Sequence, residues 1–270
     1  MLFRSTDLLV VGSGAAGLAA AVTAAHQGLR VTVLEKAPVL GGATAWSGGW
    51  MWVPGHPLAR RSGFDEDMAQ PRRYLRHELG AFHDDERVDA FLTHCGPMVA
   101  FFERHTALQF VEGHWIPDIH GDSPGAGLRG HQVAAAPLDG RVLGPLLYRL
   151  RPPMRETSLW GLPIMAGPDL AAFLSAGRSW RSLAHVCGRV WRHGRDLALH
   201  GRAMQLVNGP ALVARLALSA QQVGVALHTE QAVTGLLLED GAVIGVHTGE
   251  GARRRTWRAR RGVVLAAGGF

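Results

Sequence analysis

The residues Asp7-Leu8-Leu9-Val10-Val11-Gly12-Ser13-Gly14-Ala15-Ala16-Gly17 decide the fold of this 270-residue chain. Their first part is a short apolar run rich in β-branched residues, which is typical of a buried parallel strand. Residues 15–27 then have a helical composition. A second apolar run over residues 30–34 is closed by Glu35. Strand, helix and strand within about thirty residues predict a parallel βαβ unit.

Three glycines follow the first strand with the spacing G-x-G-x-x-G, namely Gly12, Gly14 and Gly17. The first allows a tight turn, the second lets a pyrophosphate approach the backbone, and the third lets the helix pack closely on the strand. Free N–H groups and the positive end of the following helix then favour phosphate. Between a strand and a helix, this motif predicts a dinucleotide site.

Glu35 stands about twenty residues after the glycine motif, at the end of the second strand. Its carboxylate can accept hydrogen bonds from an adenosine ribose, and its charge would repel a 2′-phosphate. The position therefore favours FAD or NAD over NADP. The alternative is a surface glutamate at a strand end.

A second glycine-rich loop, Gly41-Gly42-Ala43-Thr44-Ala45-Trp46-Ser47-Gly48-Gly49, follows almost at once. A fold that binds only NAD needs no such loop here, whereas the bulky isoalloxazine and ribityl groups of a flavin must pass close to backbone. Thr44 and Ser47 would offer hydroxyls to phosphate or ribityl oxygens. The loop favours FAD, and a glycine-rich surface loop is the alternative.

Residues 8–29 carry no charged side chain and are long enough for a membrane span. Together with Arg4 they also resemble a signal peptide. Gly12, Gly14 and Gly17 interrupt the run, so a strand, a turn and a helix explain it better. We therefore expect no transmembrane segment.

The remaining chain predicts helices, a hairpin and a return to the sheet. Helical patterns cover residues 58–110, 169–203 and 210–223, whereas residues 111–168 predict no element. The predicted hairpin pairs 233–238 with 243–248, and residues 262–269 predict a buried strand that runs into a glycine turn. The predicted fold class is α/β, a Rossmann-like doubly wound FAD-binding domain with a mainly helical insertion and a small β-meander. The predicted segments of this 1–270 domain are a core at 1–57, an insertion at 58–205 and a return to the core at 206–270.

Five separate stretches together form a recognisable pattern. They are residues 12–17, Glu35-Lys36, residues 41–49, Asn208-Gly209-Pro210-Ala211-Leu212 and residues 263–270. With them the chain resembles the fumarate reductase/succinate dehydrogenase flavoprotein superfamily, and residues 46–54 are similar to its 3-ketosteroid dehydrogenase branch. In that family a catalytic cap domain and a last flavin-binding segment follow a strand like the final one. The resemblance therefore implies an amino-terminal fragment that lacks the cap and is inactive alone.

The resemblance also implies FAD as the cofactor and a set of residues that hold it. These are Gly12, Gly14, Ala15, Ala16, Gly17, Glu35, Lys36, Gly42, Ala43, Thr44, Ser47, Gly48 and Gly49, with Val233 near the adenine and Ala266, Ala267 and Gly268 along the dinucleotide. It implies hydride transfer between flavin N5 and a carbon–carbon bond next to a carbonyl or carboxylate. The implied partners are a steroid-like or dicarboxylate-like small molecule and an electron carrier.

One motif of the 3-ketosteroid dehydrogenase branch is missing. That branch places a catalytic tyrosine in a Pro-Asp-Tyr-Tyr-like stretch, and the nearest match here is Pro117-Asp118-Ile119-His120. His120 is a hypothetical substitute, and the catalytic residues stay unassigned.

The net charge of +6 raises the alternative of a basic binding module. Six arginines lie within residues 253–261, but their alternation with other residues predicts a solvated edge strand, and we expect no nucleic-acid partner. The rival hypothesis is a non-catalytic nucleotide-binding or basic interaction module, complete at Phe270.

Histidines, aspartates and cysteines give no metal or disulfide motif. The side chains of His114, Asp118, His120, Asp122 and His131 have no metal-ligand spacing, so no metal is expected. Cys95 and Cys187 stand alone, which suits a reduced cytoplasm, although two cysteines can form one bridge.

Overall fold

The computed structural model describes residues 4–113, 116–154, 156, 158–251 and 254–269. Its contacts divide the chain into two compact units. The first unit combines Met1–Gly48 with Pro137–Phe270, and the second unit is Gly49–Ala136. The segments expected from the sequence, with an insertion at 58–205, stay a prediction.

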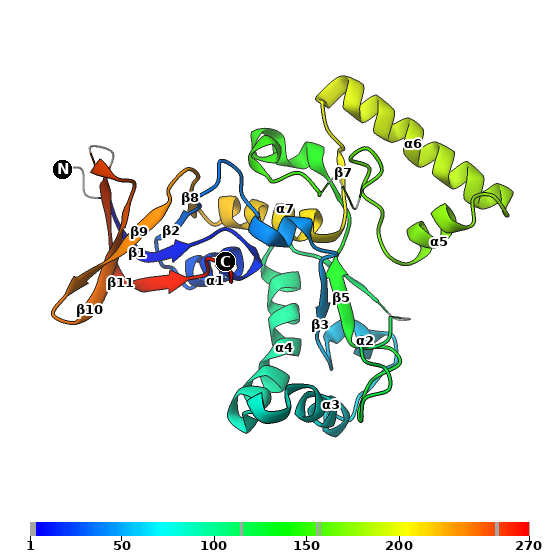
Figure 1. Ribbon diagram of the computed structural model, residues 1–270, viewed down its shortest axis with the longest axis horizontal. Coiled ribbons are helices and arrows are strands. Elements are labelled where there is room, and N and C mark those ends of the chain that lie inside the picture. The colour runs from blue at the N-terminus through cyan, green and yellow to red at the C-terminus, as the bar shows by residue number, and fades with distance from the viewer. Residues whose placement is uncertain (1–3, 114–115, 155, 157, 252–253, 270) are drawn as a thin grey trace. The chain divides into compact units, whose positions relative to one another are not determined.

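A six-stranded mixed sheet forms the centre of the first unit, in the order β8-β2-β1-β11-β10-β9. Its strands are β1 (Arg4–Val11), β2 (Val31–Leu34), β8 (Ala226–His228), β9 (Val233–Glu239), β10 (Ala242–Thr248) and β11 (Arg255–Leu265). The neighbours β8, β2, β1 and β11 pair in parallel, whereas β11, β10 and β9 pair antiparallel. Figure 1 shows the early strand β1 in blue beside the late strand β11 in red. The first unit thus has a mixed α/β architecture, as predicted, with parallel strands on one side of its sheet.

Helices and two short strands complete the first unit. They are α1 (Ala15–His26), the 3-10 segments η1 (Gly42–Trp46) and η3 (Gly140–Arg149), α5 (Pro168–Leu174), α6 (Trp180–His200) and α7 (Asn208–Gln222), with β6 (Leu138–Asp139) paired to β7 (Gln205–Leu206). Helix α1 packs on α7, and α7 also contacts η1. Small apolar residues form much of the buried surface of α7, and Ala211, Ala214 and Ala217 are fully buried.

The turn between β1 and α1 brings backbone into unusually close contact. Gly12 has a φ of +103°, and a Cβ built on it would lie 2.3 Å from the carbonyl oxygen of Ala266. A Cβ on Gly17 would lie 2.0 Å from the carbonyl oxygen of Gly12. Both glycines are therefore required by packing, which confirms the helix–strand role predicted for the third glycine.

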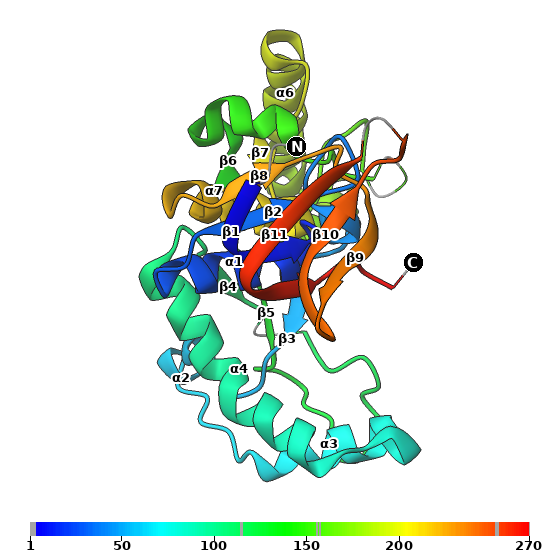
Figure 2. The ribbon, with the colours of Figure 1, turned by 90° about the vertical axis from the view of Figure 1, so that its left-hand side faces the viewer.

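The arginine-rich run does not form an edge strand, so that prediction was wrong. Residues 257–259 pair with β1 on one side and residues 255–258 with β10 on the other, and Figure 2 shows β11 between these two strands. Along this strand Trp257 and Ala259 are buried. The residues that follow each of them, Arg258 and Arg260, are exposed. The alternation thus buries one face of a central strand in a core cluster with Leu9. Arg253 lies outside the described residues.

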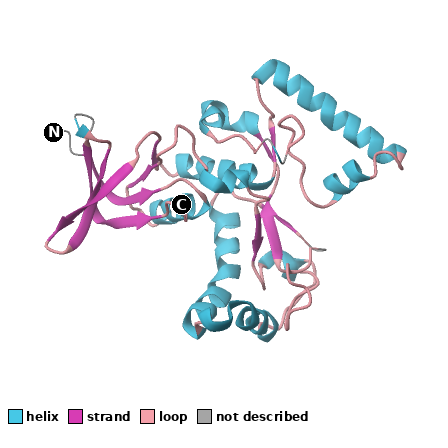
Figure 3. Ribbon diagram, viewed as in Figure 1, coloured by secondary structure: helices cyan, strands magenta, loops and turns pink. Residues whose placement is uncertain are grey.

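The second unit contains a three-stranded antiparallel sheet, β3-β5-β4, with helices. Its elements are β3 (Trp50–Trp52), α2 (Pro57–Arg61), α3 (Ala69–Leu79), η2 (Gly80–Phe82), α4 (Asp85–His105), β4 (Phe110–Glu112) and β5 (Gln132–Ala135) (Figure 3). Asp84 caps α4, because its side chain accepts a hydrogen bond from the Arg87 N–H. The strands have three or four residues each, too few for a period that the sequence would reveal.

Residues 8–29 form a strand, a turn and a helix, not a membrane span. None of the helices in the described part of the chain is long and apolar enough to cross a membrane. Cys95 is buried and Cys187 is exposed, and both are free thiols, so the chain has no bridge between them.

Replacing Gly17 by Ala tests the close contact. Alanine normally stabilises a helix over glycine by about 1 kcal/mol, but here its methyl group overlaps the Gly12 carbonyl. We expect the free energy of unfolding in urea to fall by about 2 kcal/mol or more. Gly188→Ala is the matched control, since no neighbouring atom lies within 4 Å of a Cβ at that helical glycine. Equal stability of the two variants would contradict the packing role.

Candidate functional site

A groove of about 600 Å³ opens in the first unit where β1, β2 and β11 end. Its wall is built from the first glycine turn, the end of β2, the second glycine loop and the residues after β11. The lining residues are Val11, Gly12, Ser13, Gly14, Ala15, Ala16, Leu34, Glu35, Lys36, Gly42, Ala43, Thr44, Trp46, Arg151, Gln231, Ala232, Val233, Ala266, Ala267, Gly268 and Gly269. Ligands of open α/β sheets bind at this kind of place, beyond the carboxyl ends of parallel strands.

The groove brings together thirteen of the residues that the sequence nominated. They are Gly12, Gly14, Ala15, Ala16, Glu35, Lys36, Gly42, Ala43, Thr44, Val233, Ala266, Ala267 and Gly268. Gly17, Ser47 and Gly48 are not among its lining residues, and Gly49 belongs to the second unit. The backbone N–H of Gly209 donates to the Ser47 carbonyl. Ser47 therefore joins the second glycine loop to the start of α7.

Some glycines of the groove are not required by protein packing. A Cβ on Gly14 would meet only Thr44 Oγ1, at an ordinary contact distance of 3.4 Å. A Cβ on Gly42 would come no nearer than 3.7 Å to any atom, and one on Gly268 would meet nothing within 4 Å. The space beside these glycines lies open, as a dinucleotide close to backbone requires.

A buried carboxylate holds the two glycine loops together. Glu35 is 6% exposed, and its Oε2 accepts hydrogen bonds from the Ser13 N–H at 3.0 Å and the Ser13 hydroxyl at 2.6 Å. The Ser13 hydroxyl oxygen in turn accepts from the Gly41 N–H at 3.0 Å. Glu35 Oε1 accepts from the Ala37 N–H at 2.9 Å. A carboxylate has about four acceptor positions, and the described residues fill three of those of Glu35.

Thr44 makes a second link between the two loops. Its Oγ1 accepts a hydrogen bond from the Ala15 N–H at 3.0 Å. This bond fixes the first turn of α1, where no acidic side chain offsets the positive helix end. No acidic side chain of α1 itself would therefore oppose an anion at this turn.

Arg151 and Trp46 border the groove, and sequence reasoning did not assign Arg151 to it. The guanidinium carbon of Arg151 lies 4.5 Å from the ring centre of Trp46, a cation–π contact. In the described part of the chain, the buried Nε of Arg151 has no hydrogen-bond partner. The side chain thus brings a positive charge to the border of the groove. No local motif marks Arg151, because it stands more than a hundred residues from the glycine loops.

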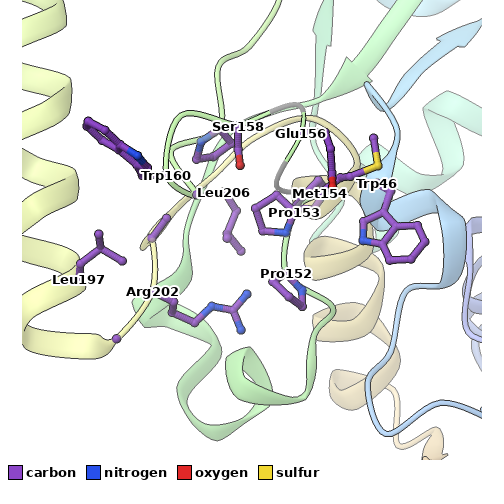
Figure 4. Close-up of a pocket in the computed structure, with 15 residues that line it drawn as sticks. Trp46, Pro152, Pro153, Met154, Glu156, Ser158, Trp160, Leu197, Arg202 and Leu206 are labelled. Carbon is purple, nitrogen blue, oxygen red and sulfur yellow. The ribbon is translucent and has the colours of Figure 1, made fainter.

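A second cavity of about 750 Å³ lies next to the groove in the same unit (Figure 4). Prolines, aliphatic residues and two tryptophans dominate its lining, with Arg202, Glu156 and Ser158 as polar members. Trp46 borders both the cavity and the groove.

The second unit holds a buried charged cluster of its own. His131 contacts Asp118 through Nδ1 at 2.9 Å and Glu66 through Nε2, and its side chain is 1% exposed. Asp118 also accepts from Trp52 Nε1 at 2.7 Å and from the Gly127 N–H at 2.8 Å.

Burial disfavours the charged imidazolium of His131, but the hydrogen bonds and charges of Asp118 and Glu66 outweigh it and raise its pKa to about 9. Burial likewise opposes ionisation of Asp118, and the bonds from His131 and the Gly127 N–H still keep its pKa below the usual value. A buried imidazolium between two carboxylates therefore holds this unit together.

His120, the hypothetical catalytic substitute, is exposed and hydrogen-bonds to Glu78. Among the described residues, no three histidines, cysteines or acidic side chains are grouped to hold a metal ion. His114 lies outside the described residues.

Comparison with known proteins identifies close relatives. A model of the "FAD binding domain" family matches residues 7–270. The 4-oxocyclohex-2-ene-1-carboxylate 5-dehydrogenase of Sinomonas cyclohexanicum is 37% identical over 98% of this chain and 44% of its own length. The 3-oxosteroid 1-dehydrogenase of Mycolicibacterium smegmatis is 35% identical over 100% of this chain and 48% of its own.

A solved structure, that of 3-ketosteroid delta1-dehydrogenase from Sterolibacterium denitrificans, is similar with a TM-score of 0.87 at 28% identity. The match covers 98% of this chain and 48% of the solved chain. The predicted resemblance to the ketosteroid dehydrogenase branch is thus confirmed. The chain spans about half the length of these curated relatives.

The raised pKa of His131 predicts that the folded chain becomes less stable as the pH rises. Its folded value of about 9 exceeds the ordinary value of 6.5, so its contribution is fully present below pH 6.5 and is lost as the pH rises through 9. Between pH 6.5 and 8.5 we expect the free energy of unfolding to fall by about 2 kcal/mol, measured by urea denaturation of the wild type.

His131→Gln should abolish that dependence, and His77→Gln, at an exposed histidine, should retain it. Stability of the wild-type chain that stays flat across this pH window would contradict a buried imidazolium.

Proposed function

Because this chain belongs to the FAD-binding domain family, we propose that it is the flavin-binding half of a dehydrogenase that desaturates a ring ketone next to its carbonyl. The observation that carries the proposal is the groove at the ends of β1, β2 and β11, where both glycine loops meet. The groove fits a dinucleotide in shape, since Gly14, Gly42 and Gly268 leave open space beside the backbone.

The first turn of α1 would hold the pyrophosphate. Its backbone N–H groups and positive end suit phosphate oxygens, and Lys36 and Arg151 bring two positive charges to the same groove. Against them stands one carboxylate, Glu35, so the lining has a positive balance. The guanidinium of Arg151 would attract an anionic ligand to this border of the groove.

The adenosine would lie at the end of β2. The remaining acceptor position of Glu35 suits a ribose hydroxyl, and its charge disfavours a 2′-phosphate at that place. Val233 and the neighbouring Ala232 would border the adenine. The second glycine loop, tied to α1 through Thr44, would then carry the ribityl chain.

Bound FAD would supply the two-electron acceptor for hydride from a substrate carbon. The residues of this chain would bind the cofactor and orient it. Reoxidation would need an electron carrier. The two free thiols suit a cytoplasmic site of action.

A cyclic ketone is the substrate class that the relatives support. The two curated relatives above are named for oxo groups on a cyclohexene carboxylate and on a steroid. The apolar cavity of about 750 Å³, which shares Trp46 with the groove, offers room for one such ring system. A ring ketone is therefore favoured over an acyclic dicarboxylate.

FAD titration of the Gly14→Ala variant tests the groove. Gly14 has an ordinary β-region backbone, and a methyl group there touches only Thr44 Oγ1, so stability should change by less than about 0.5 kcal/mol. The methyl group would occupy the path of the pyrophosphate. We expect FAD affinity, followed by flavin fluorescence quenching, to fall at least tenfold.

The matched control for that titration is Gly177→Ala, because a Cβ at Gly177 meets nothing within 4 Å and Gly177 lies outside the groove. It should bind FAD like the wild type. Equal affinity of both variants would place the cofactor elsewhere.

A chimera tests the substrate class. In it, this chain replaces the matching amino-terminal half of the Sinomonas cyclohexanicum relative. We expect the chimera to bind FAD and to reduce an artificial electron acceptor with a ring ketone but not with succinate. A chimera that holds FAD yet oxidises no ring ketone would refute the substrate class and leave FAD binding intact.

A further inference from the structure

Arg202 borders the apolar cavity of about 750 Å³ from the segment between α6 and β7. Helix α6 ends at Gly201, which has a left-handed backbone conformation, and Arg202 is the next residue. Figure 4 shows its side chain extending toward Pro152, below Leu206. Among the described residues that line the cavity, Arg202 is the only cation.

Two backbone carbonyls hold the guanidinium of Arg202. Its Nη1 donates to the carbonyl oxygen of Leu147 at 2.6 Å and to that of Leu150 at 3.4 Å. Both carbonyls lie at the end of η3, so the side chain is fixed at one end of its guanidinium. A guanidinium also carries N–H groups on Nε and Nη2. Within the described residues, these two nitrogens donate no hydrogen bond.

No acidic side chain in the described part of the chain is paired with Arg202. Glu156, the acidic residue of the lining, is exposed and forms no ion pair with it. Burial lowers the pKa of the Arg202 guanidinium, and among the described groups only the Tyr148 phenol opposes that shift. A half-buried cation without a counter-ion in an apolar cavity is unfavourable, so an anionic ligand would be stabilised beside it.

We propose that Arg202 binds a carboxylate of the substrate, so that the substrate is a ring ketone with a carboxylate on the ring. The inference rests on the proposed function, which supplies the ring ketone, and adds a second recognised group. A carboxylate is planar, and its two oxygens match two parallel N–H groups of a guanidinium. A neutral polycyclic ketone such as a steroid would leave the guanidinium of Arg202 without an anion. The cavity therefore favours an oxo acid over a neutral ketone.

The position of Arg202 also gives the substrate a direction. Trp46 borders both the cavity and the groove. Figure 4 shows Arg202 and Trp46 on opposite sides of Pro152 and Pro153. A ring whose carboxylate is held by Arg202 would lie against the prolines, with its far carbon atoms toward Trp46 and the groove. Arg202 would thus bind and orient the substrate and would transfer no proton.

Calorimetric titration of the whole chain with two ligands of nearly the same shape tests the proposal. The ligands are 4-oxocyclohexanecarboxylate and its neutral amide, 4-oxocyclohexanecarboxamide, each titrated without and with FAD. We expect the acid to bind at least tenfold more tightly than the amide, because only the acid offers an anion to the guanidinium. The ratio of the two affinities is the quantity to compare between variants.

Three variants assign that ratio to one side chain. Arg202→Gln should reduce the acid-to-amide ratio to about one, since it removes the charge. Arg202→Lys keeps the charge but loses the paired N–H groups, so its ratio should lie between those of the wild type and Arg202→Gln. The matched control is Arg215→Gln, at another half-buried arginine that donates to a backbone carbonyl, that of Pro137, outside the cavity. It should keep the wild-type ratio.

The ratio separates substrate binding from a structural role of Arg202. If Arg202 only joined η3 to the segment before β7, Arg202→Gln would weaken the binding of acid and amide alike and would leave the ratio unchanged. That result would overturn the proposal, as would a ratio near one, or no binding of the acid, in a wild-type chain whose circular dichroism shows it folded. Should Arg202→Gln not fold, an unchanged ratio in Arg202→Lys would overturn it instead.

Cyclohexanecarboxylate, which lacks the oxo group, separates this proposal from the proposed function. Binding of this acid that is lost in Arg202→Gln supports the carboxylate site even where the chimera described above oxidises no ring ketone. Turnover of neutral ring ketones by the chimera, with no preference for the acid, would instead support the proposed function and refute the role of Arg202.

Discussion

The hydrogen bonds between Glu35 and Ser13 are the interaction on which the groove depends. A buried carboxylate without donors would cost several kcal/mol, and Ser13 supplies two of its three donors. The same hydroxyl accepts from Gly41, so one side chain joins the first glycine turn, the end of β2 and the second glycine loop. A ligand that bridges the two loops therefore meets a surface already arranged for it, which lowers the cost of binding.

The glycines of this region perform two separate tasks. Gly12 and Gly17 allow backbone contacts that any side chain would block, so they belong to the packing of β1, α1 and β11. Gly14 and Gly42 have open space beside them, and in the proposed complex they lie next to the ligand. Because Gly14 is not needed for packing and has an ordinary backbone conformation, a change there would alter cofactor affinity with little effect on stability. Arg151 adds charge from a distant part of the chain and is held in place by Trp46.

Sequence reasoning succeeded where the signal was local and failed where it was distant. The βαβ unit, the glycine turn and the hairpin of β9 and β10 follow from periods and turn residues within a few positions. Nothing local shows that residues 255–259 lie between two strands, so the edge-strand prediction was wrong. Nor does spacing reveal that Glu66, Asp118 and His131 converge, since 65 residues separate the outer two. Contacts of that range are set by tertiary packing.

The most direct test of the flavin-binding groove is a calorimetric titration of the wild-type chain with FAD, NAD and NADP in parallel. The account predicts one saturable site for FAD with micromolar or tighter affinity, weaker binding of NAD, and the weakest binding of NADP because Glu35 opposes a 2′-phosphate. Binding of NAD that equals or exceeds that of FAD would contradict the assignment of the second glycine loop to a flavin.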